Sequence, residues 1–513
     1  MAGAFQDLEA KEHKFSAALL GATLLLALAL KALTKTEADP DLWGYLAFGR
    51  LFWETGNFPY HDIFSYVPTL PRWVYHEWLT GVLFYPLYQT LGAAGLQLFK
   101  YGMGLATLGL LYLTAQRRGV EVFATLLVLI VILVPLSFGF SPVRDQVFTY
   151  LFFALTLYLL ETARQTGRWR RLFLLVPLQV FWCNVHGGFL SGLGMIFIYA
   201  LGEGLSRRSF LPYVAILFLS GLATLINPYG LEYWQYLFHA ISMPRPEITE
   251  WQSLYEAFQT QNVVSLLGLI YILLAAFIFI VLGWWARWRD LTPILAFGLT
   301  LYLAIRHLRH EPFFLLVIAA YTPLLMTAFF QKIQANFHIA PRFGRLGLKI
   351  AACLILIFVA TLGYKIVKTD PLSLTLPAQP SSGNPNLKTY YPVRAVEYIR
   401  NNKLSGNLLA FFQWGEYLIW SLYPQCKVAI DGRYETVYSD EVCKEFFDFI
   451  YARGNWKRFL EHYPPDMILV NCSSGAYSRL TAEPDWQLVF HDTGSALFVK
   501  RGKFPPVTLK GKS

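Results

Sequence analysis

Charged residues are scarce in this sequence, at 15% of 513 residues, whereas a soluble globular protein carries about a quarter. Hydrophobic residues make up 55% of the chain and aromatic residues 17%, and the mean hydropathy is +0.41. This balance excludes an ordinary soluble domain. Repeated apolar runs of about 20 residues are instead typical of helices that cross a membrane.

Several familiar motifs are also missing. The five cysteines show no CxxC spacing, which excludes the usual structural zinc sites. The sequence has no P-loop, GxSxG, HExxH or dinucleotide-binding glycine pattern. No small-residue cleavage site cleanly follows the apolar run from Phe15 to Leu33, so we interpret that run as a first membrane span rather than a signal peptide.

The net charge of +10 does not indicate nucleic-acid binding, because the positions of the Lys and Arg residues along the chain have another explanation. Lys and Arg gather in short connections between apolar runs, as the positive-inside rule expects, and no aromatic-basic motif for nucleic acid is present. These inside connections carry Arg117/Arg118, Arg164/Arg168/Arg170/Arg171, Arg207/Arg208, Arg287/Arg289 and Lys332/Arg342/Arg345/Lys349. The partner expected from composition is membrane lipid, with no nucleic acid.

The apolar pattern predicts about eleven transmembrane helices. We place them at about 15–33, 95–115, 121–140, 147–163, 171–185, 188–206, 209–226, 262–284, 291–308, 312–330 and 347–367. The charge bias puts the N-terminus in the cytoplasm, and an odd number of spans puts the C-terminal part outside. The expectation is a mostly α, multi-pass protein of a bacterial inner membrane with an extracytoplasmic, periplasmic C-terminal domain.

Three domains or segments follow from this pattern. A transmembrane domain covers 1–368 and has a long first external loop at 34–93. A Pro- and Ser-rich linker covers 369–386, and an α/β domain covers 387–513. In that domain we expect helices at 393–402, 414–421, 441–452 and 455–462, and strands at 407–411, 427–430, 467–470, 487–491 and 496–500. Two of its three cysteines, Cys426, Cys443 and Cys472, could form a disulfide in an oxidising compartment.

The first external loop opens with Asp39-Pro40-Asp41. An Asp cap, a Pro at the first helical position and a second acid form a good helix start, so capping alone could explain both acids. The amphipathic stretch that follows, 41–54, is predicted to lie along the membrane interface with a lipid-facing side. That side would comprise Leu42, Tyr45, Leu46, Phe52 and Trp53. A second helical stretch is predicted at 76–90.

Other polar residues on the predicted outer face are candidate substrate-binding groups, because ionisable residues at membrane depth or on loops that cap a bundle often carry function. They are His61, Asp62, His76, Glu77, Arg144, Asp145, His186, Glu250, Asp431 and Arg433. Each also has a structural interpretation: Arg144-Asp145 and Asp431–Arg433 could be local ion pairs, and His186 a hydrogen-bonded structural residue beside two glycines.

The densest basic cluster on this face is RHLRHEPFF. Helical spacing would put Arg306, Arg309 and His310 on one side, with His307 between them. Arginine binds phosphate through two parallel hydrogen bonds, so the cluster is a candidate site for a lipid phosphate. Binding of bulk lipid alone is the other interpretation.

This arrangement resembles the GT-C superfamily of polytopic glycosyltransferases, which use polyprenyl-phosphate-linked sugars. The resemblance rests on the architecture and on Asp39-Pro40-Asp41. It implies that Asp39 or Asp41 acts as the catalytic base or binds the acceptor, and that Arg306 and Arg309 hold the lipid phosphate. It also implies that a second external-loop acid, Asp145, could help to bind a divalent cation such as Mg²⁺ or Mn²⁺, together with Asp41.

The function expected from the resemblance is sugar transfer from a polyprenyl-phosphate-linked donor to a glycan, lipid or protein acceptor, with inversion at the anomeric carbon. A lipid or glycolipid transporter, or a non-catalytic subunit of an envelope-assembly complex, would also fit the sequence. The enzyme hypothesis requires that the Asp39 and Arg306 regions, far apart in the sequence, face one cavity.

Overall fold

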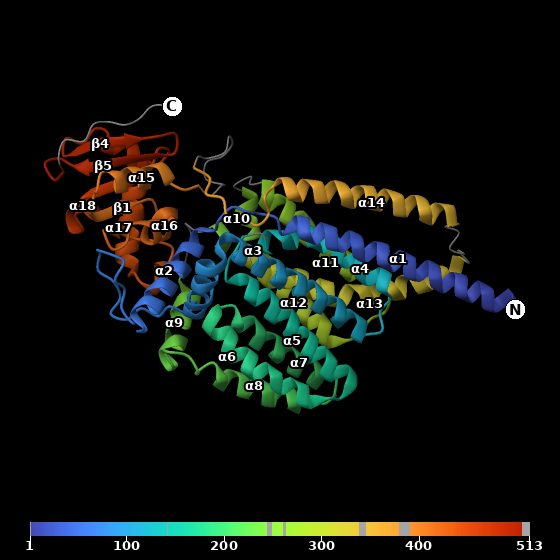
Figure 1. The fold of residues 1–513 in the computed structure, drawn as a ribbon. Coiled ribbons are helices and arrows are strands. Elements are labelled where there is room, and N and C mark those ends of the chain that lie inside the picture. The colour runs from blue at the N-terminus through green and yellow to red at the C-terminus, as the bar shows by residue number, and fades with distance from the viewer. Residues whose placement is uncertain are drawn as a thin grey trace.

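The computed structural model describes residues 2–140, 142–243, 249–259, 263–337, 345–378 and 390–504. A bundle of long helices forms one part, and a small α/β domain lies at one end of it (Figure 1). The N-terminus lies at the opposite end of the bundle from that domain.

Each predicted span coincides with a helix. The bundle contains α1 (Ala2–Ala32), α3 (Trp78–Arg117), α4 (Val122–Phe140), α5 (Gln146–Thr166), α6 (Leu175–Val185), α7 (Phe189–Leu205), α8 (Leu211–Ala223), α11 (Val263–Trp285), α12 (Leu291–Arg306), α13 (Glu311–Phe337) and α14 (Arg345–Lys368). Among the described residues, 6 helices are long and apolar enough to cross a membrane, and four more apolar helices are shorter. The count of about eleven spans therefore stays a prediction.

Helix α2 (Pro40–Thr55) lies between the bundle and the α/β domain (Figure 1). Its residues from Leu42 to Gly49 are all buried, because α2 packs against α3 on one side and α16 (Gly415–Leu422) on the other. The predicted lipid-facing side is thus wrong for Leu42, Tyr45 and Leu46, which form protein core. Trp53 at the end of the helix is 55% exposed.

The predicted loop helix at 76–90 and the next span are joined in α3. A single residue, Gly92, has a non-helical conformation (φ 60°, ψ −149°) and breaks the helix at the boundary expected for the external loop. A positive φ of this kind favours glycine, since it has no Cβ to clash with the backbone. Two further helices, α9 (Leu231–Ser242) and α10 (Leu254–Gln259), lie between α8 and α11 in the chain.

The C-terminal domain is the predicted α/β unit. Its elements are α15 (Val393–Asn401), β1 (Gly406–Ala410), α16, β2 (Cys426–Val428), α17 (Asp440–Ile450), α18 (Arg458–His462), β3 (Met467–Asn471), α19 (Gly475–Leu480), β4 (Trp486–His491) and β5 (Ser495–Lys500). The sheet order is β2-β1-β3-β5-β4: the first three strands are parallel, and the last two form an antiparallel hairpin.

Two details of the domain differ from expectation. The short helix α19 was not predicted, although Ser474 caps it by accepting a hydrogen bond from the Tyr477 N–H. The three cysteines of the domain are free, and two of them, Cys426 and Cys443, are buried. The possible disulfide is therefore not formed.

Candidate functional site

The two acids that start α2 meet a single arginine. Asp39 caps the helix by accepting a hydrogen bond from the Asp41 N–H at 3.1 Å. Arg144, from the turn before α5, places Nε 3.4 Å from Asp39 Oδ1 and Nη2 2.9 Å from Asp41 Oδ2. Its Nη1 is 2.8 Å from Glu250 Oε1. Three carboxyl groups from two separate loops thus surround one guanidinium group, which we call the Arg144 cluster.

The environment of this cluster changes the proton affinity of its acids. Burial raises the pKa of Asp41 to about 7, although Arg144 acts in the opposite direction, and the nearby Asp39 carboxylate adds to the rise. Burial also raises the pKa of Asp39. In contrast, Arg144 holds the pKa of Glu250 below its ordinary value. At neutral pH, the cluster therefore contains an ionised Glu250 and an Asp41 close to its titration midpoint.

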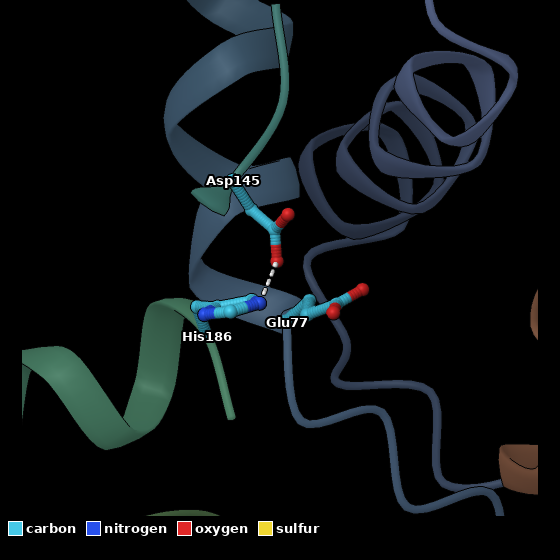
Figure 2. A group of neighbouring side chains, drawn as sticks. All are labelled: Glu77, Asp145 and His186. Carbon is cyan, nitrogen blue, oxygen red and sulfur yellow. Dashed lines mark ion pairs between the residues drawn. The ribbon is translucent and has the colours of Figure 1, made fainter. Parts of the chain in front are cut away.

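A second group of side chains lies on the other side of the same turn. Asp145, next to Arg144 in the chain, gathers with Glu77 and His186, and one ligand atom from each lies within 4.8 Å of the others. Figure 2 shows Asp145 facing His186, with Glu77 beside them; the three residues come from the start of α3, the turn before α5 and the connection after α6. His186 Nε2 is 3.7 Å from Asp145 Oδ2. We call this group the Asp145 cluster.

His186 is held by two partners on its other nitrogen. Nδ1 accepts a hydrogen bond from the Gly188 N–H at 3.0 Å and lies 2.6 Å from Thr149 Oγ1. Burial lowers the pKa of His186 to about 3, so the ring is neutral at physiological pH. Because Nδ1 accepts from Gly188, the ring proton of the neutral form lies on Nε2, the nitrogen that faces Asp145.

Glu77 and Asp145 have opposite proton affinities. Burial by itself raises the pKa of Glu77, but His76, whose Nε2 is 3.0 Å from Glu77 Oε1, brings it down to about 2. Burial and the neighbouring Glu77 carboxylate raise the pKa of Asp145 well above its ordinary value. Of these two neighbouring acids, Asp145 therefore binds a proton more readily than Glu77.

A cavity of about 330 Å³ opens beside the Asp145 cluster. Its wall brings together the polar residues His76, Thr149, His186, Trp251, Arg309, His310 and Glu435. The Arg309 guanidinium lies 4.5 Å from the centre of the Trp251 ring, and His307 Nδ1 contacts the Trp251 carbonyl at 2.7 Å. Trp251 follows Glu250 directly, so Arg144 and Arg309 approach one short segment.

The basic cluster is only partly as predicted. Helix α12 ends at Arg306, His307 is extended (φ −149°), and Leu308–His310 form a separate short 3₁₀ helix. The argument from continuous helical spacing is therefore wrong. Arg309 and His310 line the cavity, whereas Arg306 is exposed and is absent from its wall.

Asp62, Asp431 and Arg433 form a structural clamp instead of lining the cavity. Arg433 donates two parallel hydrogen bonds to Asp431, at 2.8 and 2.7 Å, and a third to Asp62 in the first external loop. Its guanidinium also lies over the Trp73 ring at 4.8 Å. These buried groups satisfy one another and tie the α/β domain to the loop, and their predicted role in substrate binding stays a prediction. His61 lies on the surface, where it contacts the Pro71 carbonyl at 2.8 Å.

One buried acid beside the Arg144 cluster was not among the predicted site residues. Glu416 of α16 accepts a hydrogen bond from the Gly44 N–H of α2 at 3.1 Å. Burial, with Asp41 close by, raises its pKa well above the ordinary value. Gly432 lies close to both Glu416 and Asp41, since a Cβ there would be 2.9 Å from Glu416 and 3.3 Å from Asp41. The sequence has no signal for this contact, because it joins two parts of the chain that only tertiary packing brings together.

The predicted metal ligands Asp41 and Asp145 lie in different clusters. The carboxylate oxygens of Asp41 and its neighbours face Arg144, a fixed cation. The Asp145 cluster fits a metal ion better, because it offers two carboxyl groups and an imidazole. In addition, Asp145 Oδ2 is buried and has no hydrogen-bond partner among the described residues.

Solved structures with this fold support the predicted family resemblance. ArnT from Cupriavidus metallidurans, bound to undecaprenyl phosphate, is 14% identical; the match covers 96% of this chain and 99% of that one, with a TM-score of 0.52. An oligosaccharyltransferase of Archaeoglobus fulgidus, in complex with zinc and sulfate, is 11% identical, with coverage of 93% and 73% and a TM-score of 0.52.

No protein-family model and no curated protein matches the sequence. The similarity to these solved structures shows that this chain shares their fold, which is mostly helical with a small C-terminal sheet, as the sequence predicted. The fold and the apolar helices together define a polytopic membrane protein.

Proposed function

We propose that this chain transfers a sugar from a polyprenyl-phosphate-linked donor to an acceptor hydroxyl on the outer side of a bacterial inner membrane. One observation carries the proposal. Acids that follow the first span and cations that precede α13 approach the same Glu250-Trp251 segment. The loops on this end of the bundle, including the α/β domain, would then be periplasmic and the N-terminus cytoplasmic.

In this proposal, Arg309 and His310 bind the phosphate of the donor in the cavity. The bond between the anomeric carbon and the phosphate oxygen breaks, and its electron pair leaves with the polyprenyl phosphate. Arg309 stabilises the negative charge that develops there. The hydrophobic part of the cavity wall, from α5, α7 and α12, suits the adjoining lipid.

The acceptor hydroxyl attacks the anomeric carbon from the opposite side and inverts it. Asp41 takes the hydroxyl proton as the new bond forms, because its side chain is 34% exposed whereas that of Asp39 is 11% exposed. A base with a pKa of about 7 is well matched to neutral pH. Asp39 positions Asp41 through the hydrogen bond to its N–H.

The cofactor is a separate part of the proposal. Glu77, Asp145 and His186 would hold a divalent cation such as Mn²⁺ or Mg²⁺. A cation there would supply positive charge next to the phosphate-binding side of the cavity. Loss of activity with EDTA and its recovery with Mn²⁺, in the wild type but not in Asp145→Asn, tests this; activity that resists EDTA contradicts it.

Transfer of a radiolabelled or fluorescent sugar from a polyprenyl-phosphate donor tests the proposed reaction. Replacing both Asp39 and Asp41 with Asn should abolish transfer, because the proposed base and the residue that positions it are then both lost. The control is Asp485→Asn, which changes an exposed acid of the α/β domain and should leave transfer unchanged. Transfer that survives the double substitution contradicts the role of these acids, and lipid movement without transfer would support a transporter.

A matched pair of arginine variants tests the proposed binding of the donor phosphate. Arg309→Ala removes a cation from the cavity, whereas Arg306→Ala removes an exposed one just beyond it. We expect Arg309→Ala to lower kcat/KM for the donor by about 10²-fold, as for the loss of a group that stabilises charge in the transition state. Arg306→Ala should change kcat/KM less than about threefold, in line with the small value of exposed charges. Equal losses in both variants would contradict the assignment.

A further inference from the structure

A second cavity, of about 700 Å³, lies at the end of the bundle opposite the α/β domain. It is formed where α11 ends, where α12 begins and by the last third of α13. Its position is fixed by Asp290, which precedes α12 and accepts hydrogen bonds from Arg118 at the end of α3 and from Arg164 near the end of α5. The proposed glycosyl-transfer site uses none of its residues.

The lining combines cations with indole rings and contains no carboxylate. Arg287, Arg289 and Lys332 supply the charge, and three tryptophans supply the rings: Trp284, Trp285 and Trp288. Lys332 Nζ lies 4.3 Å from the centre of the Trp285 ring, and Trp284 is 80% exposed. Tryptophan and cationic side chains of this kind are enriched where a membrane-spanning helix reaches the lipid headgroups.

These three cations are not neutralised by the protein. Asp290 directly follows Arg289 in the chain, but both of its oxygens accept hydrogen bonds from Arg164, at 2.6 and 2.9 Å. No ion pair among the described residues involves Arg287, Arg289 or Lys332. The sequence between Glu311 and Asp370, which includes Lys332, contains no Asp or Glu at all. The cavity therefore presents uncompensated positive charge.

The backbone at Arg287 adds an independent observation. Helix α11 ends with the Trp288 N–H donating to the Gly283 carbonyl, at 2.9 Å, and the Arg287 N–H donating to the Trp284 carbonyl, at 3.0 Å. This is a Schellman motif, in which the residue at the Arg287 position is left-handed and is most often glycine. Arg287 has φ +50°, so a long cationic side chain occupies a position where glycine would be less strained.

We propose that this cavity binds the phosphate headgroup of an anionic phospholipid in the leaflet away from the α/β domain. The cations complement the phosphate, and the tryptophans contact the glycerol and upper acyl region. The apolar faces of α11 and α12 continue the site towards the lipid tails. By the charge bias of the sequence, this leaflet is the cytoplasmic one.

Arg287→Gly in the purified full-length chain provides a test that separates lipid binding from folding. The substitution removes the charge but suits the left-handed backbone, so the thermal unfolding midpoint in detergent should stay the same or rise. Native mass spectrometry with phosphatidylglycerol should show weaker binding by about fivefold for each cation removed, in Arg287→Gly and in Arg287→Gly/Lys332→Gln. Phosphatidylcholine binding should not change.

The control is Arg207→Gly. Arg207 also has a left-handed backbone (φ +55°) at the end of a helix on the same end of the bundle, but it is not part of the cavity. Phosphatidylglycerol binding that is retained in this control and lost in the cavity variants supports the proposal. Equal losses in both, or equal binding of phosphatidylcholine and phosphatidylglycerol by the wild type, would overturn it. Full competition by millimolar inorganic phosphate would overturn the lipid assignment in favour of a soluble phosphate.

Discussion

At the scale of single residues, Arg144 organises the candidate site. It contacts Asp39, Asp41 and Glu250 together, and its neighbour Asp145 belongs to the second cluster. The adjacent residues Arg144 and Asp145 therefore contribute a cation to the Arg144 cluster and a carboxyl group to the Asp145 cluster. The positive charge keeps several nearby carboxyl groups from all taking up protons at neutral pH.

Removing the Arg144 charge should change the pH dependence of the proposed transfer. Asp41 must be ionised to act as a base, so wild-type activity should rise with pH around 7. Arg144 lowers the pKa of Asp41, and Arg144→Gln should therefore move this rise to higher pH by about 1 to 3 units. Initial rates measured from pH 5 to 10 provide the check. Arg144→Lys, which keeps the charge, should shift less, and an unchanged profile in Arg144→Gln would contradict the assignment.

Several residues that the sequence singled out for their local chemistry lie close together in the structure, although their roles stay predictions. Asp39, Asp41, Arg144, Asp145 and Glu250 were all singled out, and the structure brings them into two adjoining clusters. The predicted geometry was wrong for the basic cluster, because the chain changes direction within a few residues there. Arg306 and Arg309 were placed on one helical face, but the helix ends between them.

At the scale of secondary-structure elements, the packing of α2 on α3 decides where the acids lie. The backbones of the two helices touch at a pair of glycines: a Cβ at Gly49 would be 2.1 Å from the Gly81 carbonyl oxygen. This close approach buries the whole middle of α2. It also holds the Asp39–Asp41 end of the helix over the bundle, next to the turn that carries Arg144.

Gly49→Ala should therefore destabilise the protein, because backbone cannot move aside as a flexible side chain can. We expect a loss of about 1 to 3 kcal/mol, as for other overpacked contacts, and a lower thermal unfolding midpoint. Gly102→Ala in α3 is the matched control, since no atom lies within 4 Å of the added methyl group. It should be neutral or stabilising by up to about 1 kcal/mol, because alanine favours helix. If both variants unfold at the same temperature, the α2–α3 contact is not tight.

At the scale of the whole molecule, the α/β domain packs on the end of the bundle opposite the N-terminus (Figure 1). Arg433 links it to the first external loop through Asp62, Glu416 reaches α2, and Glu435 forms part of the cavity wall. The domain is therefore not a separate module on a tether. Gly432 of the domain also lies close to the start of α2, since a Cβ there would be 3.3 Å from Asp41 Oδ1.

Arg433→Met should loosen this connection. It leaves Asp62 and Asp431 as buried acids without a counter-charge, and breaking such a pair costs about 3 to 5 kcal/mol. The expected results are a lower unfolding midpoint and faster amide hydrogen exchange at residues 61–75. Lys444→Met is the control: it breaks an exposed pair with Asp448 and should cost less than about 1 kcal/mol. Unchanged exchange in Arg433→Met would show that the clamp does not hold the loop.

The sequence by itself determined where the apolar helices lie and which segment folds into an α/β domain, because burial in lipid or in a core requires a regular hydrophobic pattern. It also determined that polar residues of the candidate site gather at loops on one end of the bundle. Only the tertiary structure decided that α2 is buried between two domains instead of lying on lipid, since the same amphipathic pattern suits either surface. It also decided that Arg433 pairs with Asp62 and Asp431, whereas Arg144 pairs with Asp39, Asp41 and Glu250. The sequence does not show which acid each arginine contacts, because tertiary packing determines the partners in an ion pair.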